Sequence, residues 1–373
     1  MNSDLNPKNF ILFCNLKGDC YSYSELDNSF IIFKSINSIL YLISASVNNS
    51  IISFNLINTK KINEIKKWYQ KAITNFRHHL DKINKRDLIL SISASDYIVK
   101  VWNAYNFECI LNLNNIHIFH SKNYGYKLYS ACFLTDNKQD YIITSDCSDY
   151  IYSSESDPIK IFDLNGNKIK EIKESIINNT FFIDTYYDEK YSRNYIITGN
   201  CGFIESYDYN NNKIYHKYTH HNDLNNKNNI YSYESLIIST LGDNNNNNEK
   251  IILKLIASCS DGFIKIWNFH SGELLKIIKV FGTFLHGICL INNNYLAVGC
   301  GDKTIKIVDI KKKKVIKVLY DNNYVCCIKN FIHPLYGICL ISQGMKINKY
   351  NNYIYNNGIS LWVNKYKICN IEI

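Results

Sequence analysis

The sequence lacks an apolar run long enough to cross a membrane, and no stretch resembles a secretory signal. Its longest apolar runs, such as residues 251–257, have the length of a strand, and Lys254 interrupts this one. A membrane-spanning helix needs about 20 consecutive apolar residues. The segment 1–8 is polar. We therefore expect an intracellular protein, cytoplasmic or nuclear, that is neither secreted nor transmembrane.

The 13 cysteines lack the spacing of a metal site or a disulfide framework. Their number is odd, no pair shows C-x-x-C spacing, and Cys326 and Cys327 are adjacent. A structural zinc site needs pairs of cysteine or histidine ligands at close spacing. Several cysteines, including Cys132, Cys289 and Cys339, stand where a strand takes a small apolar residue. We predict buried, reduced thiols, no metal site and no cofactor.

Motifs of catalysis are also absent from the sequence. It contains no G-x-S-x-G elbow, no P-loop and no dinucleotide-binding fingerprint. The histidines are dispersed, and His78 and His79 fall on an expected strand. Paired carboxylates, such as Asp136 and Asp140, have the character of turn residues. We predict that the protein is not an enzyme. A catalytic site built from several loops is the least favoured alternative.

The composition permits a large core but does not point to a function. Apolar residues form 46% of the chain, which is ample for a globular core. Tyrosine is common, with 30 residues, and the net charge is +9. A bias of the encoding genome toward Asn, Lys, Ile and Tyr would produce such counts by itself. Arguments from these residue types therefore depend on their positions.

One pattern recurs along the chain. It consists of a short apolar strand, a turn of small residues that often holds Asp, a second alternating strand, an aromatic residue and then Asp or Asn. It is clearest in residues 88–103 (LILSISASDYIVKVWN), 255–268 (LIASCSDGFIKIWN) and 296–309 (LAVGCGDKTIKIVD). Period-two alternation bounded by turn residues is typical of strands. A further strand precedes and another follows each copy, so each unit holds four strands.

Seven copies end at aromatic or apolar anchor positions that are spaced at blade-like intervals. The anchors 54, 102, 162, 207, 267, 308 and 362 lie 48, 60, 45, 60, 41 and 54 residues apart. A four-stranded propeller blade takes about 40–45 residues, and the surplus falls in polar segments. We predict an all-β chain forming a single seven-bladed β-propeller of four-stranded antiparallel blades over residues 1–373, because closure protects sheet edges. The expected blades are 30–65, 72–113, 128–173, 180–218, 231–279, 284–320 and 324–373.

Two segments are candidates for the strand that closes this ring. Residues 10–14, in the N-terminal extension 1–29, could complete the last blade, and residues 368–371 are the rival; the sequence leaves the choice open.

The turns between second and third strands and the links between blades lie on one face, which we call the top. The turns that join first to second and third to fourth strands lie on the opposite face, the bottom.

In these features the chain resembles a divergent member of the WD-repeat family. The resemblance covers about residues 30–362, nearly the whole chain. It implies a non-catalytic scaffold or adaptor that binds a protein or peptide of unknown identity on the top face. The residues that carry the resemblance are Trp102-Asn103, Trp267-Asn268, Phe162-Asp163, Asp309, Asp96, Asp261 and Asp302.

The resemblance also implies that Asp, His, Ser and Trp side chains of one blade form a hydrogen-bonded set. In blade five, Asp261, Ser258 and Trp267 could form it with His220 or His221. Blade two lacks an obvious Gly-His dipeptide, and blade six lacks the set. The residues with an expected structural role are Ser93, Asp96, Trp102, His221, Ser258, Asp261, Trp267, Asp302 and Trp362.

The most informative top loop belongs to blade three. Its second-to-third turn, residues 146–158, is much longer than that of blade two, and it is acidic with two tyrosines. Exposed aromatic side chains among polar groups suit a protein interface. The alternative is an insertion without a partner. The predicted partner-binding residues are Asp146, Asp149, Tyr150, Tyr152, Glu155 and Asp157.

Basic residues recur on the expected bottom turns of consecutive blades and should form one arc. Such an arc, on a chain of net charge +9, could attract nucleic acid or an anionic membrane, which is the alternative function. The other interpretation is a solvated, lysine-rich surface. The sequence leaves the oligomeric state open. The residues of this basic arc are Lys60, Lys61, Lys82, Lys85, Arg86, Lys311, Lys312, Lys313 and Lys314.

Overall fold

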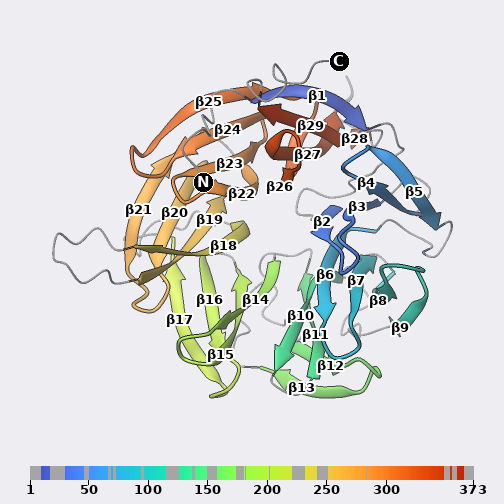
Figure 1. Ribbon diagram of the computed structural model, residues 1–373. Helices are drawn as coiled ribbons and strands as arrows, with labels where there is room; N and C mark the ends of the chain where they lie inside the picture. The colour runs from blue at the N-terminus through green and yellow to red at the C-terminus, as the bar shows by residue number, and fades with distance from the viewer. Residues whose placement is uncertain are drawn as a thin grey trace.

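The structure is a computed structural model (Figure 1). It describes residues 10–16, 30–45, 50–65, 69, 73–93, 96–114, 126–136, 139–148, 158–173, 180, 182–200, 202–220, 232–241, 251–282, 284–347, 353–354 and 359–364. These residues form strands joined by turns and contain no helix, so none offers a helical membrane span. The predicted all-β class is confirmed.

Seven antiparallel sheets follow one another around a ring, which confirms the predicted seven-bladed propeller. Blade one consists of β2 (Phe30–Lys34), β3 (Leu40–Ala45), β4 (Ile51–Asn55) and β5 (Lys60–Ile65), and blade two of β6 (Asn75–Asp81), β7 (Arg86–Ser93), β8 (Ile98–Asn103) and β9 (Cys109–Asn114). Blade three consists of β10 (Tyr126–Asp136), β11 (Gln139–Ser148), β12 (Ile159–Asp163) and β13 (Lys168–Ile172), and blade four of β14 (Phe182–Asp188), β15 (Arg193–Gly199), β16 (Phe203–Asp208) and β17 (Lys213–Thr219).

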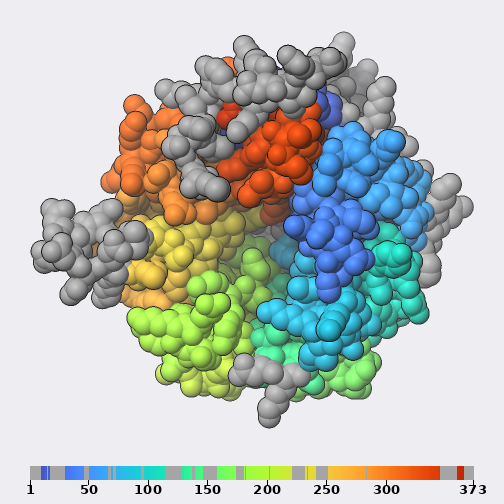
Figure 2. Space-filling model, viewed as in Figure 1, coloured from blue at the N-terminus to red at the C-terminus, as the bar shows by residue number. Residues whose placement is uncertain are grey.

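The remaining three blades complete the ring, and in Figure 2 the seven blades appear as successive sectors in chain order. Blade five consists of β18 (Ser232–Leu241), β19 (Ile251–Cys259), β20 (Phe263–Asn268) and β21 (Leu274–Lys279), and blade six of β22 (Leu285–Asn292), β23 (Tyr295–Cys300), β24 (Thr304–Asp309) and β25 (Lys314–Tyr320). Blade seven consists of β26 (Tyr324–His333), β27 (Gly337–Ile347), β29 (Ile359–Asn364) and β1 (Phe10–Leu16), with the short β28 (Tyr353–Ile354) beside β27.

The N-terminal strand β1 closes the ring. It pairs antiparallel with β29, with Phe10 opposite Asn364 and Leu16 opposite Ile359, and so supplies the fourth strand of blade seven (Figure 1). Phe10 is only 1% exposed and packs in the apolar cluster between blades six and seven. Of the two candidate closing segments, residues 10–14 occupy this position, whereas residues 368–371 lie outside the described part of the chain.

The apolar core is divided among the interfaces between blades. Each first strand contacts the first strand of the next blade, and β26 contacts β2. Apolar clusters of buried side chains fill all seven interfaces. The alternating side chains of each strand supply both neighbouring interfaces, because successive residues point to opposite faces of a sheet. No single blade could bury its faces alone.

A bulge marks the anchor of each of the first six blades. The register between third and fourth strands shifts at Phe54, Trp102, Phe162, Tyr207, Trp267 and Val308. A bulge bends the strand and increases its local twist. The repeat found in the sequence is therefore also a repeat in backbone geometry.

Candidate interaction surface

Charged side chains from three blades lie near one another in the central channel. Glu234 on β18 and Lys329 on β26 form an ion pair, and the other carboxylate oxygen of Glu234 accepts the Ile288 N–H at 2.8 Å. This one carboxylate joins blades five, six and seven. Burial works against the charge of Lys329, but Glu234 outweighs it and raises the pKa of Lys329. Arg77 on β6 donates to Asn75 Oδ1 at 3.2 Å and to the Ile183 carbonyl of β14 at 3.5 Å.

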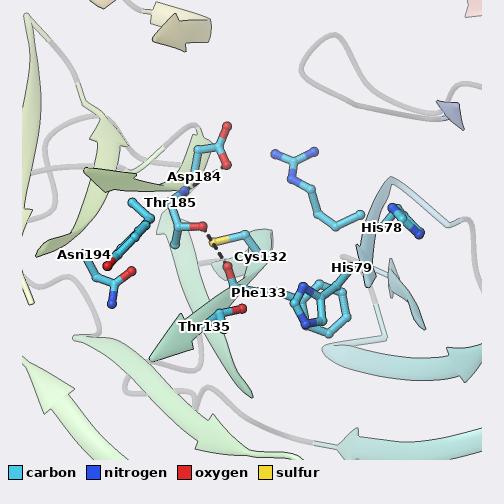
Figure 3. A pocket seen from close by; sticks show the side chains of 10 residues that line it. His78, His79, Cys132, Phe133, Thr135, Asp184, Thr185 and Asn194 are labelled. Atoms are coloured by element: carbon cyan, nitrogen blue, oxygen red, sulfur yellow. Dashed lines mark hydrogen bonds between the residues drawn. The ribbon is translucent and has the colours of Figure 1, made fainter. Parts of the chain in front are cut away.

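A pocket of about 220 Å³ opens on the channel wall between blades two, three and four (Figure 3). His79 lies 2.8 Å from Asp140 and its ring contacts that of Phe133. Thr185 donates its hydroxyl to the Phe133 carbonyl at 2.7 Å. Burial raises the pKa of the Cys132 thiol, which keeps it protonated. Because the hydroxyl is engaged and the thiol protonated, neither side chain is an activated nucleophile.

A second pocket, also of about 220 Å³, lies on the bottom face between blades one and two. The first-to-second turn of blade one contributes Ile36, and the third-to-fourth turn of blade two contributes Tyr105. Lys85, from the first-to-second turn of blade two, and Arg86, the first residue of β7, line the same pocket. We call it the blade 1–2 pocket.

The carboxylate of Asp87 holds the two sides of the blade 1–2 pocket together. One of its oxygens accepts the Ile36 N–H at 2.8 Å, and the other lies 2.7 Å from His78 Nε2. The His78 ring stacks on Phe33 of blade one, with ring centroids 4.0 Å apart. Burial lowers the pKa of His78 despite the opposing effect of Asp87, so at pH 7 the ring is neutral. The pocket wall therefore spans two blades that are fixed to one another.

Large apolar side chains are exposed on the bottom turns of blades seven, one and two. On blade seven, Ile332 is 76% exposed and Leu335 is 60% exposed. On blade two, Ile83 and Tyr105 are 72% and 75% exposed. Ile36, at 49%, lies between them on blade one. These five side chains, which we call the bottom apolar group, follow consecutive blades. Exposed apolar groups gathered on one face are typical of protein interaction sites.

The residues of the basic arc lie on bottom turns or at the start of the strand that follows such a turn. All are exposed except Arg86, which is half-buried and pairs with Asp81 at 3.0 Å. Lys61 pairs with Glu64 at 2.5 Å, and Lys312 lies 4.0 Å from Asp309. The other basic residues form no ion pair with a residue that the structure describes. They are Lys60, Lys82, Lys85, Lys311, Lys313 and Lys314.

The top loop of blade three is outside what the structure describes. Asp149, Tyr150, Tyr152, Glu155 and Asp157 are not among the described residues, and for Asp146 only the main chain in β11 is described. The role of these residues in partner binding stays a prediction.

Two of the anchor tryptophans donate to a serine on the neighbouring second strand. Trp102 Nε1 lies 2.6 Å from Ser91 Oγ, which also contacts the Tyr69 hydroxyl at 2.7 Å. Trp362 Nε1 lies 2.8 Å from Ser342 Oγ, and Ser342 in turn donates to Asp321 at 2.7 Å. On the second strand, Ile89 pairs with Trp102 and Leu340 pairs with Trp362, and in both blades the serine lies two residues after this pairing residue. This spacing is readable in the sequence, but only once the strand register is known.

The residues expected to form a set in blade five make different contacts. Ser258 donates to the His286 carbonyl at 2.5 Å, and the hydroxyl that contacts His220 is that of Ser232, at 2.9 Å. The Trp267 ring packs against the ring of His220, with centroids 5.7 Å apart. Asp261 pairs with Lys265 at 2.7 Å. His221 lies outside the described residues.

The Asp of the second-to-third turn pairs forward with a lysine in two blades. Asp302 pairs with Lys306 at 2.5 Å, as Asp261 does with Lys265 four residues on. In blade two the turn is held within itself, because Ser93 donates to Asp96 at 2.8 Å. The D-x-x-x-K spacing was visible in the sequence as a signal for these pairs. Each buries a lysine side chain, which needs a carboxylate partner.

No group of three or more His, Cys, Asp or Glu side chains is arranged to hold a metal ion in the described part of the chain. The nine cysteines whose side chains the structure describes are free thiols, and seven of them are buried: Cys132, Cys259, Cys289, Cys300, Cys326, Cys327 and Cys339.

Comparison with known proteins agrees with this architecture. Residues 236–268 match the family model described as WD domain, G-beta repeat, and they run from β18 to the end of β20 in blade five. The match covers one of the seven four-stranded blades, and the chain is in this respect similar to WD-repeat β-propellers. Proteins of this family are in general interaction scaffolds, and no catalytic family is indicated.

A stretch of 69 residues is 30% identical to the U3 small nucleolar RNA-associated protein 21 homolog of Schizosaccharomyces pombe (strain 972 / ATCC 24843). It covers 18% of this chain and 8% of that protein. The similarity therefore concerns a small part of the relative.

Proposed function

We propose that this protein is a non-catalytic scaffold that holds protein partners against the turns of its propeller. The observation that carries the proposal is the bottom apolar group, Ile36, Ile83, Tyr105, Ile332 and Leu335, which exposes large side chains on three consecutive blades. Burying such side chains stabilises a complex by about 25 cal/mol per Å² of apolar surface removed from water. A ring with seven packed interfaces supplies the rigid support that this binding requires.

The predicted top-face site is a second part of the same proposal. The acidic loop with Tyr150 and Tyr152 would add partner contacts on the opposite face. A scaffold with two binding faces can bring two partners together. Because the relative from Schizosaccharomyces pombe is named for its association with a small nucleolar RNA, we propose the nucleus as the compartment.

Affinity capture from native extract tests the proposal. The bait is the intact chain, beside a variant in which Ile83, Ile332 and Leu335 become serine and a variant in which 149–157 becomes a short Gly-Ser turn. The serine variant is expected to keep the fold, because Ile83, Ile332 and Leu335 are exposed and do not belong to the core. We expect a stoichiometric protein that survives nuclease treatment and is lost from at least one variant. Recovery of the same proteins by all three baits would contradict the proposal.

The basic arc supports an alternative, the binding of a polyanion. Six of its nine cations form no ion pair with described residues, so their charge is available to nucleic acid or an anionic membrane. Such binding weakens steeply with salt, because counterions are released from the polyanion. Neutralising Lys311–Lys314 would weaken it. Capture of nucleic acid or lipid that moderate salt washes away would favour this function over the scaffold.

A further inference from the structure

We propose that the blade 1–2 pocket on the bottom face binds a short acidic segment of a partner protein and seats one apolar side chain of that segment. The inference rests on the proposed scaffold function and specifies the chemistry of one partner.

The size of the pocket fits a single side chain. Its volume is about 220 Å³, whereas small-molecule sites usually measure about 300–1,000 Å³. A leucine or phenylalanine side chain projecting from an extended segment would fill it. The rest of the segment would then lie across the surrounding turns of blades one and two.

The rim of the pocket provides apolar surface that such an anchor would bury further. Tyr105 is 75% exposed and Ile36 is 49% exposed, and they come from opposite sides of the pocket. Tyr41 is buried and contributes to the lining. Tyrosine beside a concave apolar site is a frequent hot-spot residue, because it offers a large contact area with little loss of rotamer freedom.

The charge around the pocket selects an acidic ligand. Lys85 lines the pocket, while Lys34 is exposed at the bottom end of β2 and Lys82 is exposed on the adjacent turn of blade two. The carboxylate of Asp87, which also lines the pocket, is already engaged by Ile36 N–H and His78. Both of these partners are neutral, so the carboxylate of Asp87 keeps its charge, while Arg86 is paired with Asp81. Glu108 is the exposed carboxylate on the turn of Tyr105. Lys34, Lys82 and Lys85 therefore stand against Asp87 and Glu108. This balance leaves one net positive charge, which complements aspartate and glutamate.

The pocket is formed before any ligand arrives. The turn of blade one is closed by Ser35 N–H to the Ile39 carbonyl at 2.8 Å. The turn of blade two is held by Tyr105 N–H to Asn103 Oδ1 at 2.9 Å, and Ala104 N–H donates to the Asp87 carbonyl at 2.9 Å. A preformed site loses little entropy on binding, so even a short segment can bind measurably.

The exposed aliphatic side chains favour a peptide over a nucleic acid. Ile36 and Ile83 stand among the cations of this surface. Phosphate groups gain nothing from contact with aliphatic carbon, whereas an acidic segment with apolar residues uses both kinds of group at once. The surface therefore matches a protein segment in which acidic residues flank a large apolar one.

Selection of a random peptide library on the intact chain tests the proposal. We expect the selected sequences to share acidic residues around one large apolar residue. The shared sequence, made as a fluorescein-labelled peptide, is then titrated by fluorescence anisotropy. Tyr105→Ala should weaken its binding about tenfold, the effect of losing a hot-spot aromatic, and Lys85→Asn should weaken it roughly threefold.

Matched controls separate local contacts from general effects. Lys85 and Lys313 both have positive φ, 49° and 53°, and both are exposed on bottom turns. Asparagine tolerates this conformation, so Lys313→Asn makes the same change of charge in blade six and should leave peptide binding unchanged. Tyr320→Ala removes an exposed tyrosine on the top side of blade six and should also have no effect.

Three results would overturn the inference. The first is selected peptides without acidic residues. The second is equal binding by the Tyr105→Ala variant. The third is a labelled single-stranded oligonucleotide that binds more tightly than the peptide and depends on Lys85, which would assign the site to nucleic acid. The scaffold function itself fails only if affinity capture returns the same proteins with every bait, so the two failures can be told apart.

Discussion

At the scale of single residues, polar groups buried between blades determine how well each blade holds its shape. The Trp362 indole N–H donates to the Ser342 hydroxyl, which in turn donates to Asp321. This hydroxyl therefore connects Trp362, on the third strand of blade seven, with Asp321, in the segment that precedes the first strand of the blade. A buried group that loses its hydrogen-bond partner costs far more than the bond itself contributes.

Ser342→Ala should therefore lower the free energy of unfolding by about 1–3 kcal/mol. Ser53→Ala is the matched control, because Ser53 is also fully buried, yet its hydroxyl has no hydrogen-bond partner among the described residues. That substitution should be neutral or stabilising. Chemical denaturation of the three proteins measures the difference, and equal losses in both variants would show that the Trp362–Ser342–Asp321 chain contributes nothing.

A second residue-scale prediction concerns Glu205 on β16. Burial raises the pKa of this carboxyl to about 7, against a smaller opposing effect of Lys217, so the folded protein binds more protons than the unfolded chain between about pH 4.5 and pH 7. This contribution to stability is present at low pH and is lost as the pH rises through that window.

Glu205→Gln should therefore raise the free energy of unfolding at pH 8 by about 1–2 kcal/mol, after allowance for solvent screening, and should change it little near pH 4.5. Glu108→Gln makes the same chemical change at an exposed position and serves as the control. Thermal unfolding followed across this pH range measures both. A Glu205→Gln variant that is less stable at pH 8 would contradict the assignment.

At the scale of elements, the packing of first strands depends on small residues where two blades approach. On Gly287 of β22, a Cβ would lie 2.7 Å from the Ile328 nitrogen and 2.8 Å from the Cys326 carbonyl oxygen, both in the backbone of β26. Backbone cannot rotate away as a side chain can. The close contact between blades six and seven therefore requires glycine at this position.

Gly287→Ala should lower the free energy of unfolding by about 1–3 kcal/mol through overpacking. Gly282→Ala is its control, because a Cβ at Gly282 meets nothing within 4 Å. The two melting temperatures compared with that of the original chain test the point. If Gly287→Ala melts no lower than Gly282→Ala, the two blades do not depend on this close approach.

At the scale of the whole molecule, the ring is held shut by the pairing of β1 with β29. Phe10→Ala removes a side chain that is 1% exposed and should cost about 3–5 kcal/mol. Leu12→Ala, at a position 41% exposed on the same strand, should cost under about 1 kcal/mol. Equilibrium unfolding of both variants gives the comparison, and similar losses would mean that β1 adds little to closure.

The sequence permitted prediction of the ring but not of its surface. Seven anchors in register indicated seven blades, because the same order of apolar strand, turn, strand and anchor residue recurs in each unit. The serine partners of Trp102 and Trp362 were missed, since pairing between strands depends on a register that spacing alone does not fix. The blade 1–2 pocket was also missed, because Ile36 lies in a different blade from Asp87 and Tyr105 and meets them only through the packing of blade one against blade two.

Site-specific photo-crosslinking tests the central claim, that the bottom face of blades one and two holds a protein partner. A photoreactive phenylalanine derivative replaces Tyr105 in one version of the chain and Tyr320 in another, and both are irradiated in extract from the cells that make the protein. We predict a defined protein adduct at position 105 that competing acidic peptide suppresses, and none at position 320. Adducts at position 320 alone, or adducts at position 105 that contain only nucleic acid, would contradict the account.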